Sequence, residues 1–144
     1  PRAGDRRGSP VKPEVVALAR HRLSQAHETL AEAAQLLANR AFRGAVNRLY
    51  YAAFYAARAL LALRQADAGR HSGIISLFQQ LFIKPGLVAP EIGKTLARAF
   101  EKRQNTDYED FATVDPADAQ DLATAVQTFV ETCEALLDRS LRDL

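Results

Sequence analysis

The chain has 144 residues with 48% apolar residues, 25% charged residues and a formal net charge of +2, values typical of one globular domain. No apolar run approaches the roughly 20 residues that a membrane-spanning helix needs, so no membrane partner is expected. The single cysteine, Cys133, excludes an intramolecular disulfide and fits a reducing compartment, so we expect a cytoplasmic protein.

A polar leader precedes the first predicted helix. Residues 1–12 are rich in arginine, glycine and proline and show no apolar periodicity, so we expect them to be flexible and residues 13–144 to form one helical domain. Pro13 suits the first turn of a helix, which is predicted to end near Asn39. Its core-facing stripe is narrow and rich in alanine, which permits close helix packing, and consists of Leu23, Ala26, Leu30, Ala33 and Leu37.

The stretch from Phe42 to Leu63 is the centre of the sequence pattern. It is predicted to lie in a second helix, which follows a short break at residues 39–43 and stops near Asp67-Ala68-Gly69. Two adjacent apolar strips cover more than half of its circumference, so we expect other helices to surround it. The remaining surface carries a ridge of cationic, phenolic and amide side chains at helical spacing: Asn47, Arg48, Tyr51, Tyr55 and Arg58. Polar groups that leave water need partners, so this ridge is a candidate functional surface.

Three more helices are predicted after the central one. Ser72 is expected to cap an apolar helix that extends through Phe82 and ends at Pro85-Gly86. His71 precedes this cap and is expected either to bond locally at the helix entrance or to face the polar ridge. Pro90 begins the next helix, and Asp115-Pro116 begins the last one, in which Cys133 is expected to be a buried thiol. No segment alternates with a period of two residues, so the predicted fold is all-α, an antiparallel bundle of four to five helices.

A second candidate cluster lies late in the chain. Arg103 and Asp107 are four residues apart and can pair on one helix face, with Tyr108 one position round. The alternative is a helix-terminal ion pair with a tyrosine packed on the bundle.

The charges are unevenly distributed along the chain: residues 1–103 hold 17 Lys and Arg against 7 Asp and Glu, whereas residues 104–144 hold 2 Lys and Arg against 10 Asp and Glu. This asymmetry indicates either helices that complement each other's surface charge, or a basic face for a polyanion with an acidic end that serves a partner or a metal.

Three blocks of residues, taken together, resemble HEPN domains, and most closely the small stand-alone prokaryotic ones. The resemblance extends over residues 15–138, and its blocks are Asn47-Arg48-x-Tyr50-Tyr51-Ala-Ala-Phe54-Tyr55-Ala-Ala-Arg58, His71-Ser-Gly-x-Ile75-x-x-Phe78, and Arg103-x-x-x-Asp107-Tyr108. It implies an antiparallel helical bundle, a homodimer and, for many members, a ribonuclease toxin paired with a minimal nucleotidyltransferase antitoxin. It implies no cofactor and no metal.

The resemblance also assigns candidate roles to residues. In family ribonucleases an arginine is followed, after four to six intervening residues, by a histidine, and the two are brought together across the dimer. Arg103 matches the arginine, but Tyr108, preceded by Asp107, stands where the histidine is expected. We therefore take Arg103, Asp107 and Tyr108 as candidate catalytic residues. The candidates for RNA or nucleotide binding are Asn47, Arg48, Tyr51, Tyr55, Arg58 and His71.

Two functional hypotheses follow, with a structural alternative. The first is a HEPN protein of a toxin–antitoxin or defence system that binds RNA or a nucleotide at a polar site around Arg103 and the central helix. The second is a metal-independent endoribonuclease in which Tyr108 or His71 replaces the missing histidine. In the third, the polar groups only satisfy one another. We expect Arg48, Tyr51 and Arg103 or Asp107 to lie within hydrogen-bonding reach, within one chain or across the dimer.

Overall fold

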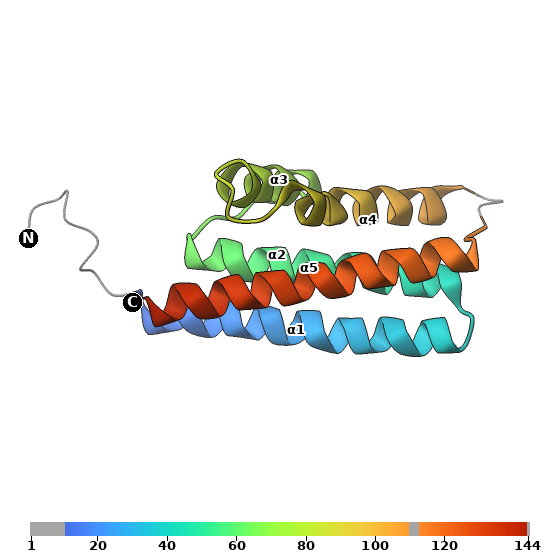
Figure 1. The fold of residues 1–144 in the computed structure, drawn as a ribbon, viewed down its shortest axis with the longest axis horizontal. Helices are drawn as coiled ribbons and strands as arrows, with labels where there is room; N and C mark the ends of the chain where they lie inside the picture. Colours follow the sequence, from blue (N-terminus) through green and yellow to red (C-terminus); the bar gives the residue numbers. More distant parts are fainter. Residues whose placement is uncertain (1–10, 110–112, 144) are drawn as a thin grey trace, which may run out of the picture.

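The computed structural model describes residues 11–109 and 113–143, and within them it contains only helices joined by short connections (Figure 1). This confirms the predicted all-α bundle. In chain order the elements are α1 (Pro13–Ala38), α2 (Phe42–Leu63), α3 (His71–Phe78), the π-helix η1 (Gln79–Ile83), α4 (Pro90–Tyr108) and α5 (Pro116–Arg142). The predicted flexible leader falls mainly on residues 1–10, which lie outside the described residues. None of the described helices is long and apolar enough to span a membrane.

Helix α2 occupies the centre of the bundle, as its two apolar strips predict. It contacts α1, α3, α4 and α5, and Figure 1 shows α1 on one side of it and α3 with α4 on the other. Its buried residues are mostly small, so neighbouring helices approach its backbone closely. Thirteen of its 22 residues are buried, among them Leu49, Tyr50, Ala53 and Leu60. The ridge predicted on its remaining surface is only partly buried.

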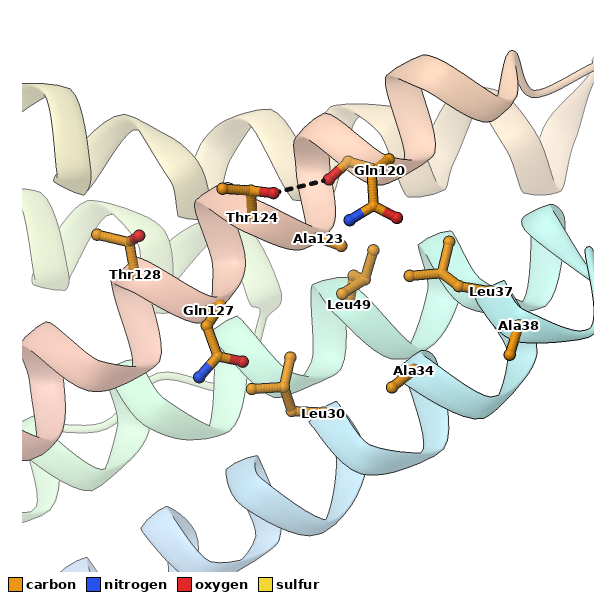
Figure 2. A pocket seen from close by; sticks show the side chains of 10 residues that line it. All are labelled: Leu30, Ala34, Leu37, Ala38, Leu49, Gln120, Ala123, Thr124, Gln127 and Thr128. Atoms are coloured by element: carbon orange, nitrogen blue, oxygen red, sulfur yellow. Dashed lines mark hydrogen bonds between the residues drawn. The ribbon is translucent and has the colours of Figure 1, made fainter.

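The alanine-rich stripe of α1 is confirmed in its middle and differs at two positions. Leu23, Ala26 and Ala33 are buried against the bundle, and Ala19 extends the stripe toward the start of the helix. Leu30 and Leu37 are only half-buried because they line an open groove of about 570 Å³ between α1 and α5 (Figure 2). The opposite wall of this groove is polar, with Gln120, Thr124, Gln127 and Thr128 of α5.

The ends of the helices show which capping predictions hold. Helix α5 begins as predicted, because the Asp115 carboxylate accepts a hydrogen bond of 2.8 Å from the backbone N–H of Ala117. The predicted Ser72 cap is wrong: α3 already begins at His71, and no side-chain hydrogen bond caps it. The helical segment includes Phe82 and stops before Pro85-Gly86, as predicted, but α3 itself ends at Phe78 and Gln79–Ile83 form the wider π-helix η1.

The core joins α3 to α5 through aromatic rings. Phe78 of α3 and Phe129 of α5 are fully buried, with ring centroids 5.4 Å apart. Cys133 is buried as predicted, and burial raises the pKa of its thiol far above the usual range, so it stays protonated. This packing fixes α3, and with it the position of His71, on the bundle.

Candidate functional site

Arg103 of α4 reaches the tyrosines of α2. Its guanidinium carbon lies 5.5 Å from the centre of the Tyr50 ring and 5.3 Å from that of Tyr51, distances at which a cation is attracted to an aromatic face. Its Nε donates to the Asp107 carboxylate at 3.1 Å, so the predicted pair four residues apart does form. The Arg103 side chain is 19% exposed, which leaves part of the guanidinium accessible to a ligand.

Arg48 contacts the same tyrosine from another direction. Its guanidinium carbon lies 5.2 Å from the centre of the Tyr51 ring, and its Nη2 donates to the Asn47 amide oxygen at 2.9 Å. Its Nη1 is 3.5 Å from the Glu32 carboxylate of α1. Within the chain, ring contacts on Tyr51 therefore replace the hydrogen bonds that we expected to join Arg48, Tyr51 and Arg103. They arise because both guanidinium groups approach the face of the ring.

His71 faces the central helix, so the second of its two predicted placements is correct. Its Nδ1 lies 2.7 Å from the Tyr50 hydroxyl, and its ring stacks on Phe54 with centroids 4.4 Å apart. The 2.7 Å contact forms in either tautomer of the neutral imidazole: the buried Tyr50 O–H donates to Nδ1, or Nδ1–H donates to the Tyr50 oxygen. In the second tautomer, Nε2, the nitrogen that points away from Tyr50, is free to accept a proton.

Burial and two arginines keep His71 neutral. Partial burial is the largest cause that lowers the pKa of His71 below its ordinary value, and the positive charges of Arg103 and Arg58 lower it further. Burial also raises the pKa of Tyr50 well above its usual range. At neutral pH the pair is therefore an uncharged phenol and an uncharged imidazole between two guanidinium groups. A neutral imidazole can accept a proton, and the guanidinium groups attract anions.

The lowered pKa of His71 predicts a pH-dependent stability. The unfolded chain carries an ordinary histidine with a pKa near 6.5, so it binds more protons than the folded chain between pH 6.5 and the lower folded value. The contribution of His71 to stability is complete above pH 6.5 and falls as the pH falls through that window. We expect His71→Gln to flatten the decline of Tm between pH 7.5 and 5. An NMR titration of His71 should give a pKa below 6.5, and an equal slope of Tm against pH in wild type and His71→Gln would contradict the assignment.

Arg58 and Tyr55 extend the ridge toward the end of α2. The Arg58 guanidinium lies 5.7 Å from the centre of the Phe54 ring and 3.3 Å from the Asp67 carboxylate. Tyr55 is half-exposed, and its ring lies 6.0 Å from that of Tyr51. The predicted ridge thus forms one surface with His71 and Arg103.

Tyr108 is at the end of α4, and it does not pack on the bundle. It is 75% exposed, so the alternative of a tyrosine packed against other helices is wrong. The structure shows no contact that joins its hydroxyl to His71 or to the tyrosines of α2 in the described part of the chain. Asp107 is part of the site because it accepts a hydrogen bond from Arg103. Tyr108 follows it in the chain and is exposed to solvent.

Sequence reasoning missed two partners of this surface. In the sequence, Tyr50 falls on one of the two apolar strips of the central helix, which predicts a packing residue. Only its hydrogen bond to His71 in the structure shows that it orients the imidazole. Arg43, at the start of α2, donates to the backbone carbonyl of Thr106 at 2.5 Å and ties the end of α4 to α2.

No group of three or more His, Cys, Asp or Glu side chains within residues 11–109 and 113–143 is arranged to hold a metal ion. The arrangement is suited to binding anions and to moving a proton at His71.

Comparison with known proteins places this helical bundle in a family. The HEPN domain model matches residues 19–136. The chain is 35% identical over 114 residues to a UPF0332 protein of Thermotoga maritima, covering 79% of this chain and 86% of that protein. It is 34% identical over 83 residues to "Putative toxin MJ0605" of Methanocaldococcus jannaschii, covering 58% of this chain and 62% of that protein. With a matched region that includes α2, His71 and the Arg103–Asp107 pair, the chain belongs to the HEPN domain family.

Proposed function

We propose that this HEPN protein binds RNA, or a nucleotide, on the surface built by Arg103 and α2, and that it acts in a toxin–antitoxin or defence system. The observation that carries the proposal is the position of Arg103 on the rings of Tyr50 and Tyr51, beside the neutral His71. Arginine donates in pairs to phosphate oxygens, and a guanidinium held on aromatic faces loses little freedom when it binds one.

The aromatic residues beside these cations favour a nucleic-acid ligand over a simple anion. Tyr51 and Tyr55 are partly exposed on the same ridge as Arg48 and Arg58. Single-stranded nucleic acids bind where cations follow the backbone and aromatic rings receive the bases. A surface that offers both groups, with no metal ligands needed, fits an RNA strand.

The test of this function is RNA binding with matched arginine variants. Fluorescence anisotropy of a labelled single-stranded RNA should show saturable binding that weakens as salt rises. Arg103→Gln should weaken binding about tenfold or more, because a hydrogen bond to a charged group is typically worth about 1.5–3 kcal/mol. Arg98→Gln is the control, since Arg98 is exposed on the same helix and lies outside the site. The proposal is wrong if wild type binds no RNA or nucleotide, or if the two variants bind equally.

A second candidate function, metal-independent RNA cleavage, is favoured by the state of His71. In the tautomer whose Nδ1–H donates to Tyr50, the unprotonated Nε2 can accept the proton of a ribose hydroxyl, and Arg103 can stabilise the negative charge that develops on the phosphoryl oxygens. His71 would then perform, from α3, the proton transfer that histidine performs in the Arg-His motif of family ribonucleases. The exposed Tyr108 is the competing candidate for this role.

The proposed partners follow from the family rather than from a contact in the chain. The name of the Methanocaldococcus jannaschii relative refers to a toxin, which supports a toxin–antitoxin setting for this chain. A minimal nucleotidyltransferase antitoxin is the partner that this setting implies, and a homodimer in the cytoplasm is the proposed working form. Two copies would place two Arg103 surfaces in one assembly.

A further inference from the structure

Arg22 of α1 lies beside Arg58 of α2, outside the motifs that identify the family site. Its Nη1 donates to the backbone carbonyl oxygen of Arg58 at 3.2 Å. This bond crosses between two helices and holds the Arg22 guanidinium on the backbone of Arg58. Besides partial burial, the positive charge of Arg58 lowers the pKa of Arg22, so the two cations are near enough to repel each other.

The charge at this place is incompletely balanced. Three arginines of the site each have a carboxylate within ion-pair distance: Arg48 with Glu32, Arg58 with Asp67, and Arg103 with Asp107. The described residues give Arg22 no such partner. Partial burial and then the positive charge of Arg58 lower the pKa of Arg22, while Asp67 raises it. Two cations against one carboxylate leave a site that an additional anion would stabilise.

Asp67 is held weakly enough for a stronger anion to replace it. Its carboxylate oxygens lie 3.3 and 3.4 Å from Arg58 Nη2, which is long for a charge-assisted hydrogen bond. Its side chain is 57% exposed, and one oxygen also accepts the backbone N–H of Ala68 at 2.9 Å. Arg58 Nε is buried and has no hydrogen-bond partner among the described residues, whereas the Arg58 side chain as a whole is 26% exposed, so a ligand would reach its outer nitrogens.

The arginine pair adjoins the candidate site through one aromatic ring. Phe54 carries the stacked His71 ring at 4.4 Å and the Arg58 guanidinium at 5.7 Å. Arg103 approaches His71 by way of Tyr50 and Tyr51 instead. The cations of Arg58 and Arg103 therefore flank His71, and Arg22 extends the row of cations from α2 onto α1.

We propose that Arg22 and Arg58 form a second phosphate subsite, which holds the backbone phosphate of the nucleotide next to the one bound at His71 and Arg103. The ligand is single-stranded RNA, and its phosphate displaces the Asp67 carboxylate from Arg58. This inference rests on the proposed RNA-binding function. It predicts that the protein contacts at least two consecutive phosphates and therefore binds an oligonucleotide more tightly than a mononucleotide.

The experiment compares Arg22→Gln with Arg20→Gln, an exposed arginine of α1 outside the row. For a labelled single-stranded RNA, Arg22→Gln should weaken binding about tenfold. It should also reduce the slope of log K against log salt by about 0.7, the value for one lost phosphate contact. Arg20→Gln should bind as wild type does. For a mononucleotide monophosphate, Arg22→Gln and wild type should bind equally, since that ligand occupies only the His71–Arg103 position.

Two further variants separate charge from folding. Arg22→Lys keeps the cation and should restore the wild-type salt slope. Asp67→Asn removes the competing carboxylate and should raise RNA affinity about threefold or more. If wild type binds RNA through Arg103 but Arg22→Gln matches Arg20→Gln, the subsite is wrong and the proposed function stands. If wild type binds no RNA at all, the proposed function fails and the subsite fails with it.

Discussion

Alanine in place of His71 is expected to lower RNA cleavage by about 10²–10⁴-fold, the usual contribution of a positioned acid or base. The imidazole is oriented by the Tyr50 hydroxyl at 2.7 Å and kept neutral by partial burial and by the charges of Arg103 and Arg58. Arg103→Ala should lower the rate by about 10²–10³-fold, as expected for the loss of a group that stabilises the charged transition state. Single-turnover cleavage of a labelled RNA between pH 5.5 and 8 measures both effects.

His27→Ala and Tyr108→Phe are the controls for this experiment. His27 is an exposed histidine of α1 that pairs with Glu134 of α5 at 3.1 Å, and its removal should leave cleavage unchanged. Tyr108→Phe keeps the ring and removes the hydroxyl. If Tyr108→Phe stops cleavage while His71→Ala does not, the proton transfer belongs to Tyr108. If wild type binds RNA and cleaves none, the nuclease candidate is wrong and the binding function stands alone.

The helices were predictable because their side chains repeat with the helical period. The central helix is predicted because apolar residues surround most of it, and it is observed from Phe42 to Leu63. Its predicted end near Asp67–Gly69 is wrong by about one turn: the helix stops at Leu63, and Gln65 adopts a positive φ of 51° just after it. The start of α5 was equally clear, because an aspartate before a proline both caps and opens a helix. The wide turn of η1 has no such signal: its residues continue the apolar run of α3, and the change lies in the backbone hydrogen bonds.

The candidate site was predictable only where its contacts are local. Arg103 and Asp107 are one helical turn apart, so their pairing follows from sequence spacing alone. His71 and Tyr50 lie 21 residues apart on different helices, so their hydrogen bond depends on how α3 packs on α2. Likewise, no pattern on α1 distinguishes Arg22 from a surface arginine until α1 is packed against α2. The choice between hydrogen bonds and ring contacts for Arg48 and Arg103 depends on the same packing.

Phe129→Ala is expected to destabilise the fold by about 3–5 kcal/mol, the largest loss of stability that we predict for a single substitution. Phe129 is fully buried on α5, and its ring contacts Phe78 of α3 at 5.4 Å, so truncation leaves a cavity between two helices. For a domain of this size the loss lowers Tm by about 10–20 °C. Thermal unfolding followed by circular dichroism measures it, with Leu18→Ala as control.

The same substitution connects the core to the candidate site. Phe78 and His71 are on one helix of eight residues, so a looser contact at Phe78 should also disturb the stacking of His71 on Phe54. Leu18 is 43% exposed on α1, and its truncation should change stability by at most about 1 kcal/mol, because little buried apolar area is lost. Equal shifts of Tm for Phe129→Ala and Leu18→Ala would show that α5 does not support α3. A large shift that also weakens the Tyr50–His71 contact, seen as a raised pKa of His71 in the NMR titration, would show that this aromatic core positions the site.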